Sequence, residues 1–152
     1  MRVSMIGQAA FGEAALKRLQ EDGVEICAVS APAPAEGKRP DPLWAAAENA
    51  GISPIDTRQL KTDEGMAQWR AVEADLCVMA FVTELLPNEI FAVPAKGTIQ
   101  YHPSLLPLHR GSSAINWPVI FGARRRRDDL LAGRGHRHGP HPATEVLPDR
   151  AA

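Results

Sequence analysis

The most constraining feature of the sequence is a run of seven apolar residues, Leu76 to Val82, in which no polar residue alternates with the apolar ones. A strand that faces water on one side alternates apolar and polar residues, so a continuous run predicts a strand covered on both faces. Strands of this kind belong to parallel sheets that carry helices on both sides. We therefore expect an α/β fold built around Leu76–Val82.

Strand-like segments and segments with helical periodicity alternate along residues 2–101. The predicted strands are Arg2–Ile6, Val24–Val29, Ile52–Ile55, Leu76–Val82 and Thr98–Tyr101. The predicted helices are Phe11–Glu21, Leu43–Asn49 and Asp63–Val72, and a loop covers Ala31–Pro42. This alternation predicts a Rossmann-like, doubly wound and mainly parallel sheet, which binds its ligand at the carboxyl ends of the strands.

The turn after the first predicted strand lacks the glycine pattern of a nicotinamide dinucleotide site. Only Gly7 and Gly12 occur there, with Gln8 to Phe11 between them. A dinucleotide site uses three glycines at a fixed spacing, which let the pyrophosphate approach the backbone. We therefore expect no nicotinamide cofactor in this segment.

Length and composition indicate one domain, or part of one, because the 152 residues are 45% apolar and 23% charged. No apolar run approaches the length of a membrane span, and the N-terminus lacks the pattern of a signal peptide. We expect a cytoplasmic protein without a membrane partner. Cys27 and Cys77 each lie in an apolar run, which favours buried thiols over a disulfide or a metal site, so no metal is expected.

The charge of the chain is distributed unevenly. Residues 1–123 carry 10 Lys and Arg against 14 Asp and Glu, whereas residues 124–152 carry 7 against 4. The basic tail begins with Arg124–Arg127. A tail of this composition is compatible with a nucleic-acid-binding arm.

His102 is the strongest candidate for a catalytic residue. It follows the last predicted strand directly and precedes Pro103, which stiffens the backbone. An imidazole held at the carboxyl edge of a parallel sheet can exchange a proton near neutral pH, as a general acid or base must. A structural histidine bonded to a backbone carbonyl is the alternative that position alone leaves open.

Several segments resemble, in order and spacing, the folate-dependent formyltransferase family. They are Met5–Gln8, Phe11–Gly12, Gly37–Lys38, Asp41–Leu43 and His102–Trp117, the last reading HPSLLPLHRGSSAINW. The pattern is similar to the N-terminal hydrolase domain of 10-formyltetrahydrofolate dehydrogenase, which belongs with methionyl-tRNA and glycinamide ribonucleotide formyltransferases. The resemblance covers residues 1–123.

The resemblance implies a role for the residues around His102. In the family, the histidine matching His102 polarises the formyl group or its developing oxyanion. Many transferases carry Asn two positions earlier, as an amide donor to the same oxygen, and Gln100 stands there in this chain. Tyr101 favours the hydrolase branch over the tRNA-formylating branch. The resemblance thus implies 10-formyltetrahydrofolate as formyl donor and a small-molecule folate as partner.

The resemblance also implies folate-binding residues. Glu84, Leu85 and Leu86 match the stretch whose backbone holds the pterin ring, with Phe81 near it. A strand-to-helix turn that ends at Pro87 would explain the same stretch. Ser104 and Arg110 are further binding candidates, which as a turn former and a carboxylate partner also have structural explanations, and Asn116 can be a polar residue of a helix.

The family pattern breaks near Ala123. After a helix that matches Ala114–Gly122, the family continues into a strand rich in Ile, Phe and Trp, and then into a D-x-G-x-D-T-G loop. An aspartate of that loop activates water or the acceptor. From residue 123 onward this chain has no aromatic residue, no isoleucine, and no strand or helix period. We expect a partial formyltransferase-like domain over residues 1–123, incomplete at its C-terminal side, and an out-of-frame or disordered basic tail over residues 124–152.

A shift in reading frame explains the break. Gly135–His141 can be encoded as GGG CAT CGA CAC GGG CCC CAT, and the reading that starts one base later spells Gly-Ile-Asp-Thr-Gly-Pro-Ile. The same shift across Arg127–Ala143 permits VTIFWPDEGIDTGPILL, which is the continuation that the family pattern requires. We hypothesise a single-base insertion or deletion near Ala123. Because Glu145–Asp149 resembles the family in the present frame, a second, compensating change is open as well.

The frameshift hypothesis has consequences for structure and function. The arginine run becomes a product of GC-rich codons, which disfavours the nucleic-acid arm. The sheet is expected to lose its last strand, which would leave an unpaired edge and low solubility. The chain is expected to lack the catalytic carboxylate and to be inactive in hydrolysis of 10-formyltetrahydrofolate to tetrahydrofolate and formate. Formyl transfer to an amine, on methionyl-tRNA or a nucleotide sugar, and a non-catalytic folate-binding remnant are the alternatives.

Overall fold

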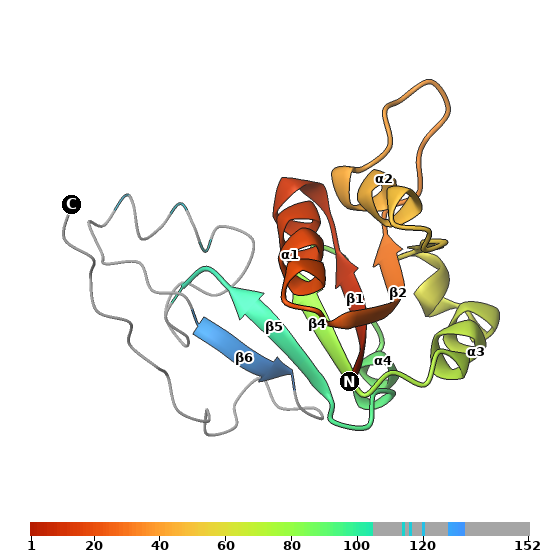
Figure 1. Ribbon diagram of the computed structural model, residues 1–152, viewed down its shortest axis with the longest axis vertical. Coiled ribbons are helices and arrows are strands. Elements are labelled where there is room, and N and C mark those ends of the chain that lie inside the picture. The colour runs from red at the N-terminus through yellow and green to blue at the C-terminus, as the bar shows by residue number, and fades with distance from the viewer. Residues whose placement is uncertain (105–113, 115, 117–119, 121–127, 133–152) are drawn as a thin grey trace.

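The sheet of this protein has six strands in the order β3-β2-β1-β4-β5-β6 (Figure 1). In the computed structural model, the described residues are 1–104, 114, 116, 120 and 128–132. The strands are β1 Arg2–Gly7, β2 Glu25–Ala31, β3 Ile55–Asp56, β4 Leu76–Ala80, β5 Thr98–His102 and β6 Asp128–Ala132. The first five strands are parallel and β6 is antiparallel to β5.

Helices connect the parallel strands and cover both faces of the sheet (Figure 1). They are α1 Ala9–Glu21, α2 Pro42–Asn49, α3 Asp63–Ala71 and α4 Asn88–Ala92, with a short 3₁₀ helix, η1, at Gln59–Lys61. On one face, Met5 and Val29 of the sheet form a core with Leu16 of α1 and Leu43 of α2. On the other face lies a second core, whose members from the sheet are Ile6, Cys77 and Met79 and whose members from the helices are Leu60, Trp69 and Ile90. The doubly wound α/β prediction is confirmed.

Glycine allows β1, α1 and α2 to approach closely. A Cβ atom on Gly7 would lie 2.6 Å from the carbonyl oxygen of Ala80 in β4. On Gly12 it would lie 3.0 Å from Cδ2 of Leu43, a fully buried residue of α2. The two glycines after the first strand therefore serve packing between neighbouring elements.

Capping residues define where two helices begin. The Asp41 carboxylate accepts a hydrogen bond from the Leu43 N–H at 2.9 Å, and Pro42 occupies the first turn of α2. The Thr62 hydroxyl oxygen accepts one from the Gly65 N–H at 3.1 Å at the start of α3. Both helices begin within one residue of the predicted positions.

Four elements differ from the prediction. The third strand is only Ile55–Asp56, because the Ile52 N–H donates to the Ala47 carbonyl at 2.9 Å and closes the end of α2. The strand β4 stops at Ala80, because Phe81 adopts a φ of 60° and leaves the extended conformation. The helices η1 and α4 were not predicted, since three and five residues are too short to show a helical period.

The expectation of an unpaired edge and of no strand after Ala123 is wrong. Residues Asp128–Ala132 pair with β5 in a register that runs from Thr98 opposite Ala132 to His102 opposite Asp128. The pairing uses backbone N–H and C=O groups, which every sequence without proline supplies, so an edge strand can form without an apolar pattern.

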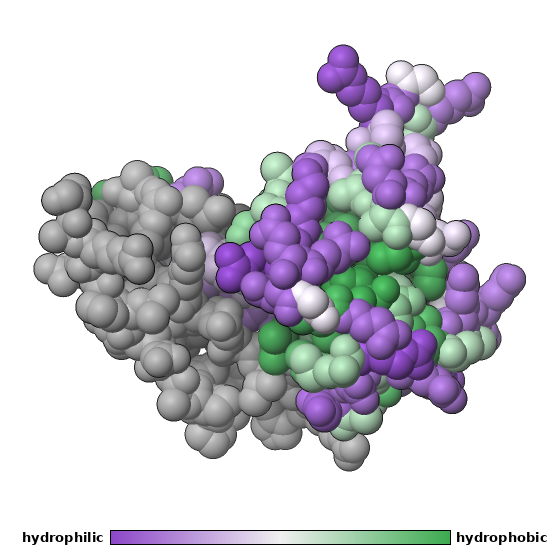
Figure 2. Space-filling view, viewed as in Figure 1, coloured by the Kyte–Doolittle hydropathy of each residue, from purple (hydrophilic) through white to green (hydrophobic). Residues whose placement is uncertain are grey.

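Figure 2 shows hydrophilic residues over the outer side of α1 and at the tip of the loop of residues 32–41, and a hydrophobic area beside α1. This loop links β2 to α2 and stands away from the rest of the fold (Figure 1). Asp41 lies at its base.

Candidate active site

The carboxyl ends of β1, β4 and β5 lie side by side. Gly7 is in register with Ala80, and Met79 is in register with Gln100. The Gln8 N–H, one residue beyond β1, donates to the Ala80 carbonyl at 3.3 Å. The topology therefore brings the β1–α1 turn, the segment after β4 and the end of β5 to one edge, where parallel sheets bind ligands.

His102 ends β5 at this edge, and its side chain is held by Ser104. The Ser104 N–H lies 3.3 Å from His102 Nδ1, and the Ser104 hydroxyl oxygen lies 3.0 Å from the same atom. A backbone N–H can only donate, so Nδ1 acts as the acceptor and the neutral ring carries its proton on Nε2. The imidazole is thereby set as a hydrogen-bond donor through Nε2.

Gln100 and His102 share one face of β5, because side chains two residues apart in a strand point the same way. Tyr101 points to the opposite face, where its ring centroid lies 4.7 Å from that of Phe11 in α1. The strand geometry thus puts Gln100 and His102 on one face of β5, and their role as two donors to one oxygen stays a prediction.

The four folate-binding candidates after β4 occupy different environments. Phe81 is 45% exposed and Leu85 is 79% exposed. Glu84 forms an ion pair with Lys61 of η1 at 2.5 Å. Leu86 packs against the core on the α3 side of the sheet. Leu86 therefore anchors the segment to the core and the ion pair of Glu84 tethers it to η1, while Phe81 and Leu85 are exposed; folate binding by this segment stays a prediction.

The remaining candidates are placed less fully. Ser104 is buried, at 1% exposure, and its contact is with the imidazole. Arg110 lies outside the described residues, as does the region from residue 133 onward where the shifted reading places the aspartate loop. Asn116 is described and exposed. Folate binding by Ser104 and Arg110 stays a prediction.

Sequence reasoning gave no role to three polar residues at this edge. The Thr83 hydroxyl donates to Gln8 Oε1 at 3.3 Å. The Asp41 carboxylate accepts the Ala9 N–H at 2.9 and 3.1 Å with its two oxygens, in addition to the Leu43 N–H. Asp41 and Gln8 belong to segments that resemble the family, but the resemblance gave no function for either residue.

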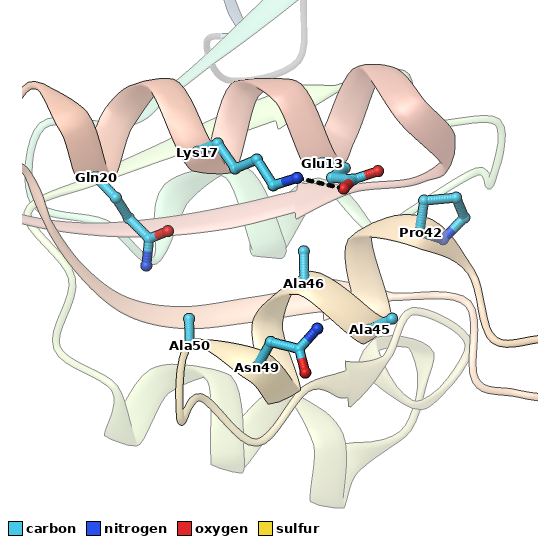
Figure 3. Close-up of a pocket in the computed structure, with 8 residues that line it drawn as sticks. All are labelled: Glu13, Lys17, Gln20, Pro42, Ala45, Ala46, Asn49 and Ala50. Carbon is cyan, nitrogen blue, oxygen red and sulfur yellow. Dashed lines mark hydrogen bonds and ion pairs between the residues drawn. The ribbon is translucent and has the colours of Figure 1, made fainter.

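Two hollows lie on the surface beside α1. One, of about 430 Å³, is mainly apolar and lies against β4 and β5, where Gln100 and Tyr101 line it together with Phe11. The other, of about 480 Å³, lies between α1 and α2 and contains the Glu13–Lys17 ion pair at 2.6 Å (Figure 3). No candidate residue lines the second hollow, so it is not part of the proposed site.

The described part of the chain contains two cysteines. Cys77 is fully buried and Cys27 partly so, and both are free thiols. Burial raises the pKa of the Cys77 thiol to about 12. Residues 1–104 and the other described positions contain no cluster of three metal-ligating side chains. No described helix is long and apolar enough to cross a membrane.

Comparison with known proteins identifies the family. The Formyl transferase profile matches residues 1–126. The chain is 36% identical over 130 residues to human cytosolic 10-formyltetrahydrofolate dehydrogenase, covering 82% of this chain and 14% of that protein. It is 35% identical over 128 residues to methionyl-tRNA formyltransferase of Bradyrhizobium sp., covering 80% of this chain and 41% of that protein. The chain belongs to the formyl transferase family, and it spans less than half the length of these relatives.

Solved structures agree on the fold. Phosphoribosylglycinamide formyltransferase from Bacillus halodurans superposes with a TM-score of 0.74 at 19% identity, covering 99% of this chain and 81% of that one. A formyltetrahydrofolate deformylase from Pseudomonas syringae pv. tomato gives a TM-score of 0.72 at 17% identity, covering 96% of this chain and 50% of that one. The Rossmann-like α/β architecture is shared with both.

Proposed function

We propose that the chain comes from a one-carbon enzyme that hydrolyses 10-formyltetrahydrofolate to tetrahydrofolate and formate. Family membership and the 36% identity to a 10-formyltetrahydrofolate dehydrogenase support the substrate. The observation that carries the proposal is the contact of the Ser104 N–H with His102 Nδ1, because it sets Nε2–H as a donor at the edge where the folate would bind.

In this proposal the chain supplies donors where negative charge develops. Water adds to the formyl carbon, the carbon–oxygen π electrons move onto the formyl oxygen, and His102 Nε2–H and the Gln100 amide stabilise that oxyanion. As the intermediate collapses, the bond from carbon to N10 breaks and N10 takes a proton that the attacking water has lost, and the formic acid that leaves ionises to formate. The segment from Glu84 to Leu86 holds the pterin ring during these steps.

We propose further that this chain is catalytically incomplete, because a base near the attacking water is missing. Asp128 and Asp129 are the carboxylates next in sequence, but both lie within β6, and Asp128 pairs in register with His102 as part of a strand. A glycine-flanked loop is what the family uses to direct its aspartate at the formyl carbon. Loss of one member of a cooperating pair removes most of the rate while ligand binding survives.

Formate release from 10-formyltetrahydrofolate tests the proposal in two chains. One is the chain as it stands, and the other has residues 127–143 replaced by VTIFWPDEGIDTGPILL, the shifted reading. We expect no turnover above the spontaneous rate in the first and clear turnover in the second. In the second chain, His102→Ala should abolish the gain. Turnover by the unaltered chain at the rate of the repaired one would contradict the missing base.

Two other functions have support. The 35% identity to a methionyl-tRNA formyltransferase favours transfer to an amine. The missing aspartate loop favours a folate-binding remnant without catalysis. Labelled formyl donor distinguishes the three: label appears in formate for hydrolysis, in formylmethionyl-tRNA for transfer, and remains on the bound donor for the remnant.

A further inference from the structure

We propose that Gln8 is a positioning residue, which holds the turn at Phe81 and thereby the segment from Glu84 to Leu86 in the conformation that accepts the pterin ring. The inference rests on the proposed function for the identity of the ligand. The hydrogen bonds that support it join residues of this protein and involve no ligand.

Phe81 needs to be held, because its backbone adopts a left-handed conformation. Its φ is 60°, a region that bulky residues rarely enter because Cβ approaches the carbonyl oxygen. Gln8 contacts the chain on both sides of Phe81. Its N–H donates to the Ala80 carbonyl at 3.3 Å, and its Oε1 accepts the Thr83 hydroxyl at 3.3 Å. One residue therefore spans the strained position.

Gln8 is itself fixed from the opposite side. The next residue, Ala9, also has a left-handed φ, of 58°. Its N–H donates to both carboxylate oxygens of Asp41, which caps α2 as well. Two strained turns after adjacent strands are thus connected through Gln8 and anchored to the start of α2. Strain of this kind persists where surrounding contacts fix it, and such positions gather at ligand sites.

The segment after Phe81 has few other restraints on its exposed side. Leu85 is 79% exposed, and the Glu84–Lys61 ion pair is a solvent-exposed contact. Without the Gln8 contacts, ligand binding would have to order this segment at a cost in conformational entropy. Gln8 reduces that cost in advance, so its loss should weaken binding without removing any group that touches the ligand.

The test measures binding of 5-formyltetrahydrofolate to the full chain by titration calorimetry. We expect Gln8→Ala and Thr83→Val each to raise Kd about threefold to tenfold, the effect of one hydrogen bond. The double variant should bind no more weakly than either single variant, because both remove the same contact. Gln8→Glu keeps an acceptor for the Thr83 hydroxyl and should retain the original affinity. Gln20→Ala, elsewhere on α1, is the matched control and should change nothing.

The outcomes separate this inference from the proposed function. Unaltered affinity in Gln8→Ala, with binding by the starting chain intact, would overturn the role of Gln8 alone. Absence of folate binding in the starting chain would instead count against the proposed function. In that case amide hydrogen exchange decides on Gln8: faster exchange at residues 81–86 in Gln8→Ala but not in Gln20→Ala supports the restraint, and equal exchange in the two variants overturns it.

Discussion

The backbone conformation of Glu73 is unfavourable for a residue with a Cβ atom, and a single substitution can remove this destabilisation. It follows Val72, the C-cap of α3, and has a left-handed φ of 52°. Glycine is favoured at this position of a helix end, since it has no Cβ. We expect Glu73→Gly to raise the free energy of unfolding by about 1 kcal/mol and the melting temperature by a few degrees.

The control for this prediction is Glu73→Ala, which removes the same charge but keeps Cβ. The backbone carbonyl of Glu73 accepts the Arg2 guanidinium at 3.2 Å in either variant, so that contact is preserved. Thermal unfolding followed by circular dichroism compares the two. Equal melting temperatures would show that the left-handed backbone is not the source of the cost.

Because of Cys77, the free energy of unfolding should fall as pH rises in the alkaline range. Burial raises the pKa of its thiol to about 12 in the folded state, from an ordinary value of 9.0. A raised pKa means that the neutral thiol is favoured by folding, so the contribution is fully present below pH 9.0 and is lost as pH rises toward 12. We expect the free energy of unfolding of Cys77→Ala to fall less steeply between pH 9 and 11, measured by urea unfolding. Parallel declines in the two proteins would refute this.

Single residues were predictable from sequence only where a local pattern marked them. His102 could be placed because a strand period ended directly before it, and the buried Cys77 because it lay in an apolar run. The Gln8–Thr83 hydrogen bond joins residues 75 positions apart and depends on two left-handed turns. Neither long-range hydrogen bonds nor left-handed φ values at Ala9 and Phe81 have a sequence signature.

At the scale of elements, close packing of β1 against β4 should make Gly7 intolerant of substitution. A Cβ atom there would lie 2.6 Å from the Ala80 carbonyl oxygen, and backbone must move to relieve the contact. We expect Gly7→Ala to cost about 2 kcal/mol or more. Gly12→Ala is the comparison, because its first contact, at 3.0 Å, is the end of the Leu43 side chain and helix propensity favours Ala.

Urea unfolding of the two glycine variants provides the measurement. The critical result is which substitution lowers the free energy of unfolding more, since both add one methyl group in neighbouring positions. The packing argument would be contradicted if Gly12→Ala lowered the free energy of unfolding as much as Gly7→Ala, or more.

Elements were predictable in proportion to their length. The segments around α1, α3 and β4 each show several turns of period or a long apolar run, and their positions agree with the structure to within two residues. The two-residue β3 and the five-residue α4 are set by tertiary contacts. The strand β6 has no apolar pattern, and its formation depends on the open edge of β5.

At the scale of the whole molecule, β6 connects the structure to the frameshift hypothesis. The shifted reading would place Thr, Ile, Phe, Trp and Pro at positions 128–132, which are the five positions of β6. The same strand would then bring large apolar side chains to the sheet. Each Å² of apolar surface that they bury would stabilise the fold by about 25 cal/mol. We expect the chain with residues 127–143 in the shifted reading to unfold at a higher urea concentration and to remain monodisperse on size exclusion.

A comparison chain with the same composition in scrambled order over residues 127–143 controls for added hydrophobicity. The scrambled chain should unfold at a urea concentration no higher than that of the unaltered chain, and it should aggregate. Equal unfolding midpoints for the shifted and scrambled segments would remove the structural support for a frameshift, although they would leave membership of the family untouched.

The carboxylate of Asp41 also determines which molecules this edge can admit. It bonds to the first amide of α1 and caps α2, so the positive ends of two helix dipoles are neutralised from within the chain. In nucleotide-binding versions of this architecture, a diphosphate takes the place at the start of the first helix. Here the negatively charged Asp41 carboxylate would repel an incoming phosphate, which would have to displace it from the start of α1. The Asp41 carboxylate thus disfavours a diphosphate at the start of α1 in this chain.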